Sequence, residues 1–421
     1  MQKIRNYIQE ITKSRFVKNL GITFFENITI KIFGFFITLI LVRNLGPEHY
    51  GIYSFILVNV IVLSTLIDFG MENTAIRFSN KDKSTQNSIF GLYFLTKLAV
   101  LLICVFILIF WGKNILVGLH KPELIKYLPF FILGFLGESL FFVNDTYLQS
   151  VQQFKLRAII NITRYITLFS FVVFLVLNKL LFLKYVAFVF IIPVIFILFF
   201  IPRYLIFIKS FFKQKLSKNL FGEILKYEKW MIALAVVGAA LSRVDIYMLS
   251  FLVNYAQLGI YSAAYNLISI VAFIPYSLGK VMFPKMSETP LKEVFGLTLR
   301  ITKPILLMSV LLLLFIPIFH FIVPISFGHK YDGSIIIAQI LLIATLISFV
   351  FLPVETSIYV IGKPKYVLLC RQIQLIILIV LNILTIPRFG MIWGAVNLVI
   401  ARFVHGMILL YIFYREKEAY E

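Results

Sequence analysis

The sequence predicts an all-α membrane protein with twelve transmembrane helices, arranged as two like-facing six-helix lobes around a central cavity. Of its 421 residues, 61% are hydrophobic and only 14% are charged, whereas soluble domains are about half apolar and a quarter charged. The apolar stretches are continuous, without alternation, which favours helices over barrel strands. A short motif also recurs half a chain later: Gly51-Ile52-Tyr53-Ser54 and Gly259-Ile260-Tyr261-Ser262. Such a repeat indicates a duplicated module.

Each expected span is long enough to cross a hydrocarbon core of about 30 Å as a helix. Gly46 and Pro47 mark the start of the second span, because proline is tolerated in a first helical turn, and Gly70 marks its end. The twelve expected spans are 17–42, 48–69, 88–111, 124–149, 155–178, 183–205, 227–253, 257–284, 297–319, 333–361, 365–387 and 391–414.

The two copies keep the same order, so the lobes should be parallel repeats related by an axis along the membrane normal. A second pair of landmarks agrees, since the segment 147–154 is echoed at 359–366. We expect an N-terminal lobe at 1–208, a basic cytoplasmic linker at 209–226 and a C-terminal lobe at 227–421. The linker is either an amphipathic segment on the inner leaflet or a plain positively charged tether.

Basic residues set the expected orientation. If the amino terminus is cytoplasmic, the inner segments hold 27 of the 40 Lys and Arg residues and the outer loops hold 8. Because positive charge collects on the cytoplasmic side, the asymmetry predicts a multi-pass protein of the cell membrane with both termini inside. The net charge of +21 then reflects contacts with membrane lipids, and nucleic acid is not expected as a partner.

No signature of energy coupling or catalysis is visible. The sequence contains no G-x-x-x-x-G-K-[ST] loop, no H-E-x-x-H motif and no Cys/His cluster with metal spacing. No loop between spans exceeds about 25 residues, so there is no room for a soluble catalytic domain. We therefore expect neither an enzyme nor a cofactor or metal site. Two equivalent lobes are typical of a secondary transporter, whose halves rock around a site at their seam.

Ionisable residues inside spans are the candidate functional residues, because a charge in lipid costs several kcal/mol. The basic set could line a cavity that attracts a phosphate group, and it comprises Lys31, Lys97, Arg164, Arg243 and Arg402. The acidic set could couple ions or gate the cavity, and it comprises Glu26, Asp68, Glu72, Glu138, Asp145, Asp245 and Glu355. The alternative for every one of these residues is a structural ion pair between helices.

These landmarks resemble the first hairpin of Wzx-type polysaccharide exporters: Arg43-Asn44-Leu45-Gly46-Pro47, then Tyr50-Gly51, then Asp68-Phe69-Gly70. That family belongs to the MOP superfamily, with the MATE drug exporters and the lipid II flippases. The second lobe is similar to its seventh and eighth helices through Arg243-Val244-Asp245, the segment 258–264 and Phe283-Pro284. The lipid II flippases have fourteen membrane-spanning helices, so the twelve spans expected here differ from their pattern.

The resemblance implies a MATE-like fold and a flippase that moves a polyprenyl-(pyro)phosphate-linked oligosaccharide from the inner to the outer leaflet for surface polysaccharide biosynthesis. Polysaccharide polymerases and glycosyltransferases are the partners that it implies. One alternative is a MATE-like multidrug or cation antiporter, which needs a net acidic cavity. Another is a membrane enzyme such as a polymerase, which needs a catalytic loop that this sequence lacks.

Overall fold

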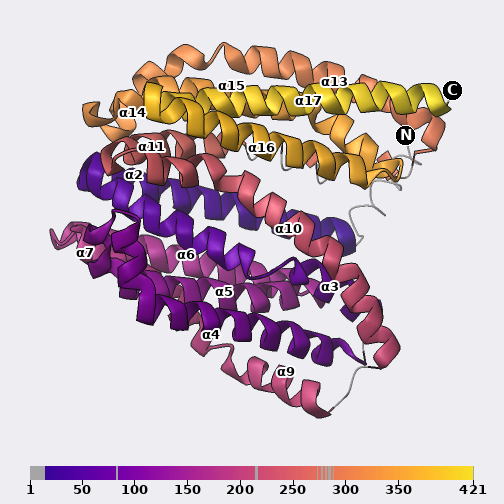
Figure 1. The fold of residues 1–421 in the computed structure, drawn as a ribbon, viewed down its shortest axis with the longest axis horizontal. Coiled ribbons are helices and arrows are strands. Elements are labelled where there is room, and N and C mark those ends of the chain that lie inside the picture. Colours follow the sequence, from indigo (N-terminus) through magenta and orange to yellow (C-terminus); the bar gives the residue numbers. More distant parts are fainter. Residues whose placement is uncertain are drawn as a thin grey trace, which may run out of the picture. The chain divides into compact units, whose positions relative to one another are not determined.

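The protein is helical throughout the described residues, as the computed structural model in Figure 1 shows. The structure describes residues 15–81, 84–213, 217–272 and 289–420, together with 274–275, 278–279, 282 and 286–287. Several segments lie outside the described residues: 1–14, residues 214–216 of the expected linker, and Phe283 and Pro284.

The chain divides into two compact units. Unit 1 comprises Met1–Ile37 and Asn59–Ala239, and unit 2 comprises Thr38–Val58 and Ala240–Glu421. Two long helices, α2 (Arg15–Leu66) and α10 (Lys218–Leu252), contribute residues to both. The lobes expected from the sequence are continuous segments, at 1–208 and 227–421 with a linker at 209–226, whereas each unit combines two segments of the chain. The lobe boundaries stay a prediction.

Unit 1 is built around one aromatic core. Phe90 and Tyr93 of α4 pack with Phe141 of α5 and with Phe207 of α9, and α4 packs along both α9 and α5. Besides its parts of α2 and α10, the unit contains α3 (Met71–Lys81), α4 (Gln86–Gly118), η1 (Pro122–Tyr127), α5 (Leu128–Ser150), α6 (Phe154–Leu177), α7 (Leu183–Val186), η2 (Ala187–Ile191), α8 (Ile192–Leu198) and α9 (Ile201–Lys213).

Unit 2 has its core around α15, which packs most extensively against α17, α11 and α13 and also contacts α14 and α16. Phe349 and Ile358 of α15 meet Val367 of α16 and Phe413 of α17 there. Besides its parts of α2 and α10, the unit contains α11 (Tyr255–Val271), α13 (Leu291–Leu313), η3 (Ile316–Ile318), α14 (Phe319–Phe327), η4 (His329–Tyr331), α15 (Gly333–Val360), α16 (Pro364–Phe389) and α17 (Ile392–Tyr420).

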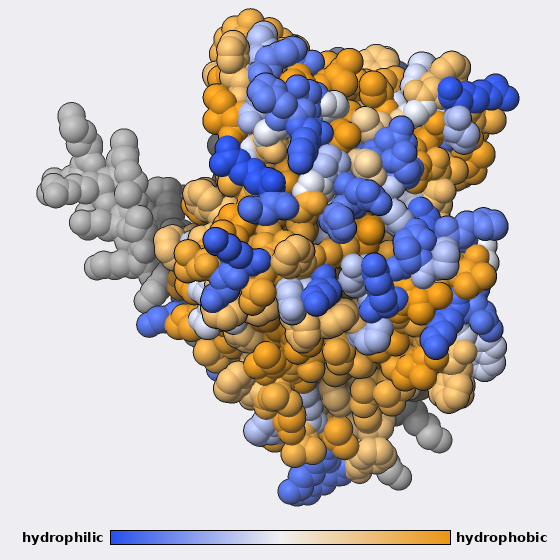
Figure 2. All heavy atoms as spheres, turned by 90° about the vertical axis from the view of Figure 1, so that its left-hand side faces the viewer, coloured by the Kyte–Doolittle hydropathy of each residue, from blue (hydrophilic) through white to orange (hydrophobic). Residues whose placement is uncertain are grey.

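Apolar side chains cover much of the surface, as a bilayer protein requires. Figure 2 shows hydrophilic and apolar residues exposed together on one face. Helix α4 shows the apolar part of this surface. Large apolar side chains in its second half face outward: Leu102, Ile103, Phe106, Ile107, Ile109, Phe110 and Trp111. Such a surface is stable in hydrocarbon and would aggregate in water.

Nine helices of the described residues are long and apolar enough to cross a membrane, or ten if the bent pair Leu183–Leu198 and Ile201–Lys213 forms one span. The first of the nine, Gly21–Leu66, runs through two of the expected spans. The span expected at 257–284 includes residues outside the described part. The multi-pass helical architecture is confirmed, and the count of twelve stays a prediction.

The break expected before Pro47 lies inside α2. Gly46 has φ 73° and ψ 169°, so two helices meet there at a kink. Proline disfavours the helical conformation in the residue before it, and glycine adopts a positive φ at little cost. The Gly46-Pro47 pair therefore separates the two spans that the sequence predicts at 17–42 and 48–69.

The two copies of the repeated motif meet within unit 2. A Cβ atom on Gly51 would lie 1.8 Å from the carbonyl oxygen of Tyr255, and one on Gly259 would lie 1.9 Å from the carbonyl oxygen of Pro47. Tyr255 follows Pro47 by the same 208 positions that separate the two glycines. The glycine of each copy therefore packs against the equivalent residue of the other copy. Such reciprocal contacts are the pattern of a two-fold relation.

Candidate functional site

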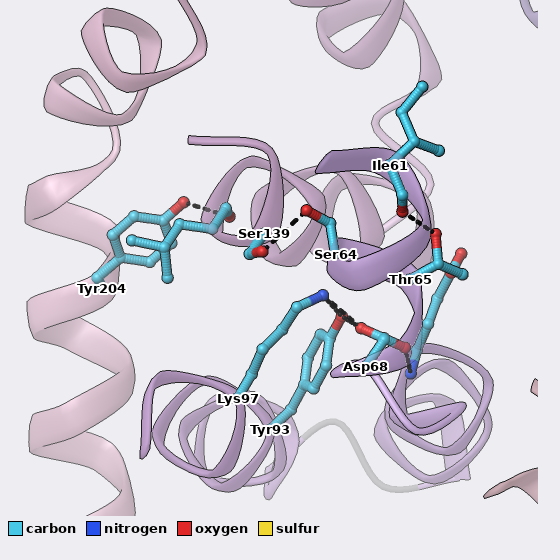
Figure 3. Close-up of polar contacts among 10 residues, drawn as sticks. Ile61, Ser64, Thr65, Asp68, Tyr93, Lys97, Ser139 and Tyr204 are labelled. Atoms are coloured by element: carbon cyan, nitrogen blue, oxygen red, sulfur yellow. Dashed lines mark hydrogen bonds and ion pairs between the residues drawn. The ribbon is translucent and has the colours of Figure 1, made fainter. Parts of the chain in front are cut away.

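The polar interior of unit 1 begins at Asp68, in the turn between α2 and α3. Lys97 Nζ donates to Asp68 Oδ1 at 2.5 Å, and Tyr93 Oη donates to the same oxygen at 2.5 Å. Figure 3 shows both side chains leaving α4 and converging on the carboxylate. Lys97 is 1% exposed and Asp68 is 8% exposed. Tyr93 and Lys97 are four residues apart, so they lie on the same helix face.

Asp68 also organises the chain around it. Its second oxygen, Oδ2, accepts a hydrogen bond from the backbone N–H of Glu72 at 3.1 Å, which satisfies one of the donors exposed at the start of α3. Phe69 and Gly70 both have positive φ, 51° and 80°, so the chain reverses sharply there. Asp68 is therefore the anchor of the turn before α3.

A second ionic group joins α2, α5 and α6. Arg157 donates to both oxygens of Asp145, Nε to Oδ1 at 2.8 Å and Nη2 to Oδ2 at 2.9 Å, and its Nη1 lies 3.6 Å from Glu26 Oε2. Asn161 bridges the two acids, since its Nδ2 donates to Glu26 Oε1 at 2.7 Å and to Asp145 Oδ1 at 2.8 Å. Glu26 is 2% exposed, and its ion pair with Arg157 and its hydrogen bond from Asn161 compensate its burial.

Two more buried pairs complete the group. Arg164 of α6 donates to Glu138 of α5 and lies over the Phe141 ring, 4.5 Å from its centroid. Arg203 of α9 donates to Asn144 of α5. Acidic or amide partners therefore already hold the bases of this interior, as burial of charge in a dry interior demands.

Burial also raises the pKa of the Glu72 carboxyl, and the nearby charge of Asp68 raises it further. Glu72 lies in α3, outside the candidate spans.

Unit 2 places two bases around an aromatic ring. The guanidinium carbon of Arg243 lies 4.8 Å from the centroid of the Tyr265 ring. Arg402 of α17 interacts electrostatically with Tyr265 and with Asp245. Asp245 accepts a hydrogen bond from Tyr261 Oη at 2.8 Å. Within the described part of the chain, neither Arg243 nor Arg402 forms an ion pair with a carboxylate.

One ionic bridge in unit 2 resembles those of unit 1. Arg371 of α16 donates to Glu355 Oε1 of α15 through Nε at 3.0 Å and through Nη2 at 2.6 Å. His405 lies within electrostatic reach of both residues. Like the Arg157–Asp145 pair, this bridge joins consecutive helices across a short turn.

The structure thus separates the predicted basic residues. Lys97 and Arg164 are paired with acids in unit 1, Arg243 and Arg402 gather around Tyr265 in unit 2, and Lys31 lies exposed on α2. The predicted acids likewise occur in separate groups. No described residues form a group of three His, Cys, Asp or Glu side chains suited to a metal ion.

Several polar residues of the interior were not among the candidates from the sequence: Asn144, Arg157, Asn161, Arg203, Glu228, Arg371, Asn382 and Asn397. Arg157 and Arg203 lie near the ends of their expected spans, where a base can reach the membrane surface. The asparagines carry no charge, so a search for in-span charges passed over them. Amide side chains inside apolar helices would have been the signal, because a buried amide needs partners.

A sequence model of the family described as polysaccharide biosynthesis proteins matches residues 16–290. This match covers more than half of the chain. The chain belongs to the polysaccharide biosynthesis protein family. Within the wider set of curated proteins, a putative O-antigen transporter of Shigella flexneri is 22% identical over 206 residues. That alignment spans 48% of this chain and about half, 49%, of the relative.

Solved structures establish the fold of this family member independently. The lipid II flippase MurJ in an inward closed conformation superposes with a TM-score of 0.73 at 15% identity, over 94% of this chain and 87% of that one. An inward-facing MATE multidrug transporter of the MOP superfamily gives 0.71 at 13% identity, over 93% and 95%. A MOP superfamily transporter from Pyrococcus furiosus gives 0.61 at 13% identity, over 96% and 93%. The predicted resemblance and the MATE-like fold are confirmed.

Proposed function

We propose that this protein is a flippase that moves a polyprenyl-(pyro)phosphate-linked oligosaccharide from the inner to the outer leaflet of the cell membrane. Its membership of the polysaccharide biosynthesis family carries the proposal. The likeness to a putative O-antigen transporter and to a lipid II flippase supports it, since both names describe handling of glycan precursors. The protein acts as a transporter without catalysis, and surface polysaccharide is the product that its cargo serves.

Within unit 2, Arg243 and Arg402 are the residues we assign to the phosphate. Arg243 lies beside Tyr265, and Arg402 interacts electrostatically with the same tyrosine. Asp245 interacts electrostatically with both bases, but no described carboxylate forms an ion pair with either. Guanidinium groups grip phosphate oxygens bidentately, and tyrosine rings suit sugar faces. Lys97 and Arg164 serve the fold of unit 1 instead, because Asp68 and Glu138 already neutralise them. Lys31 remains a candidate for cargo binding on α2.

The direction of transport agrees with the membrane potential. Moving one negative charge outward across 100 mV, inside negative, is favourable by about 2.3 kcal/mol. With both termini cytoplasmic, the basic linker at 209–226 would face the leaflet from which the cargo is collected. Glycosyltransferases that complete the cargo and a polymerase that consumes it are the proposed partners.

The acids have two proposed roles: they hold basic side chains between helices, and they couple an ion to transport. Glu26, Asp68, Glu138 and Asp145 hold bases in unit 1, where a change of protonation would release a helix contact. In unit 2, Glu355 pairs with Arg371 and Asp245 accepts a hydrogen bond from Tyr261, so protonation of either acid would change a contact between side chains. The pKa of Glu72 is raised in part by the charge of Asp68. Each is a candidate for coupling a proton or Na⁺ to transport.

The test is transport of a fluorescent polyprenyl-phosphate-linked oligosaccharide into the outer leaflet of proteoliposomes, read by lectin accessibility. In the variant R243Q/R402Q the transport rate should fall at least about tenfold. This is the decrease expected when a charge-assisted contact of about 1.4 kcal/mol or more disappears. R243K/R402K should retain part of it. R388Q removes an exposed charge elsewhere in unit 2 and serves as the matched control.

Normal transport by R243Q/R402Q would refute the assignment of the phosphate to this pair. If the purified protein ignored the lipid-linked glycan and instead exchanged an organic cation for protons, the MATE-like antiporter would replace the flippase.

A further inference from the structure

Helix α10 runs antiparallel to α3 within unit 1, and the two helices approach each other very closely. A Cβ atom on Gly70 would lie 2.6 Å from the carbonyl oxygen of Met231. Further along, Thr74 lies beside Glu228, and the Phe78 and Tyr227 rings meet edge to face at 5.9 Å. Successive residues of α3 thus meet successively earlier residues of α10, and Gly70 is needed for the approach.

Glu228 is the exception in this interface. Its side chain is buried, with 9% of the residue exposed, and both carboxylate oxygens are inaccessible to solvent. Among the described residues, neither oxygen completes a hydrogen bond. The Thr74 hydroxyl, in a residue that is 3% exposed, is likewise buried without a hydrogen-bond partner. An ionised carboxylate in such a position would bear the cost of desolvation with only the neighbouring Thr74 hydroxyl to offset it, and no cation.

The charged groups around Glu228 do not neutralise it. The charge that acts on it is Asp68, which is of the same sign, and Lys97 is already bonded to Asp68. From α3, Glu72 is a further acid, and Arg77 lies over the Tyr227 ring, 4.3 Å from its centroid.

The bases on the neighbouring helices are directed elsewhere. On α10 itself, Lys226 and Lys229 are exposed. On α9, Arg203 donates to Asn144, while Lys209 and Lys213 are exposed. The described residues contain no group of three acids or other ligands suited to a metal ion. A proton is therefore the ligand that satisfies the site.

We propose that Glu228 is a proton-binding site whose protonated form locks α10 onto α3. The neutral carboxyl donates its O–H to the Thr74 hydroxyl oxygen after a small rotation of the side chain, and this bond gives a partner to Thr74 and to one oxygen of Glu228. Loss of the proton leaves a carboxylate that Asp68 repels, so α3 separates from α10 and water reaches the carboxylate. Because α10 contributes residues to both units, the lock acts on a helix that both share.

The linkage has a definite sign. In the closed state α10 is locked onto α3, and in the open state the two helices are separated. Over the pH range in which Glu228 is protonated only in the closed state, that state holds one proton more than the open state. Opening should therefore become about tenfold more favourable for each unit of rising pH in that range. The inference concerns a conformational equilibrium and does not depend on which cargo the protein carries.

Two measurements on the full-length protein in nanodiscs test it. Amide hydrogen exchange of α3 and of residues 218–235 is compared as protection factors, which remove the intrinsic base-catalysed rise of the exchange rate with pH. In the wild type, protection should fall with rising pH by up to the tenfold per unit given above. E228Q mimics the protonated form and should keep its protection at every pH. T74V keeps the shape of Thr74 but removes the acceptor, and it should speed exchange at low pH.

Infrared difference spectra provide the second measurement. The wild-type protein minus E228Q should show the carbonyl-stretch band of a protonated carboxyl at neutral pH, a band that a merely structural role for Glu228 would not require. E223Q, which changes an exposed acid on the same helix, is the matched control and should leave both measurements unchanged. Identical pH profiles for wild type and E228Q, or absence of the band, would overturn the proposal. Protection that depends on Na⁺ at constant pH would assign the site to a cation and would also overturn it.

Discussion

The two units differ in how they satisfy their buried polar groups. Unit 1 holds charges in three ionic groups across its helices: Lys97 with Asp68, Arg157 with Asp145 and Glu26, and Arg164 with Glu138. Unit 2 has the bridge between Arg371 and Glu355, but it also has a fully buried group that is neutral. There Asn397 Nδ2 donates to Asn382 Oδ1 at 2.8 Å and to Thr385 Oγ1 at 2.7 Å, and both asparagines have no exposed surface.

This difference shows that the interior of a helical membrane protein can satisfy buried polar atoms either with ion pairs or with neutral amides. The close glycine contact between the repeats survives in both copies of the motif, since backbone distance leaves no choice of residue. Interior charge can differ, because an ion pair and a neutral pair fill similar space. What each requires is only that its own polar atoms find partners.

Removing Lys97 should have the largest effect on stability. K97M leaves the Asp68 carboxylate buried without its cation, which should lower the free energy of unfolding by about 3–5 kcal/mol. Denaturant titration in detergent, followed by tryptophan fluorescence, measures it. K113M removes an exposed lysine of the same helix and should be nearly neutral. D68N/K97M should recover part of the loss; equal stability of K97M and K113M would show that the pair contributes little.

A smaller effect is expected from the neutral group of unit 2. N397A removes two hydrogen bonds and leaves Asn382 Oδ1 buried, so we expect a loss of about 1–3 kcal/mol in the same titration. The double variant N382L/N397L removes the polar atoms on both sides and should cost less than N397A. If N397A were as harmful as K97M, the contrast between charged and neutral interiors would have no energetic basis.

The smallest effect concerns pH. The folded pKa of Glu72 is raised by burial and then by Asp68, so its ionisation opposes folding. This penalty is absent below the ordinary pKa of a glutamate and grows as pH rises through the folded pKa. E72Q should therefore stabilise the protein at neutral pH, by no more than about 1 kcal/mol, and lose its advantage in acid. Melting temperatures across a pH series measure the change, and a pH-independent advantage would contradict the assigned cause.

Several features could be predicted from the sequence because they depend on local chemistry. Continuous apolar runs identify membrane helices, since lipid leaves the backbone no other partner than itself. Gly46 followed by Pro47 fixed the break in α2, and the spacing of Gly51 and Gly259 identified the duplication. The presence of charge inside spans pointed to the residues that would need partners.

Only the tertiary structure decided which partners those residues have. Arg157 reaches Asp145 and Glu26 because three helices bring them together, and no spacing along the chain shows that Arg243 and Arg402 gather at one tyrosine. The same is true of Glu228, whose isolation beside Thr74 depends on the close passage of α10 past Gly70. The physical reason is that helix formation is set by neighbours within a turn, whereas the electrostatic state of a buried group is set by every element packed around it.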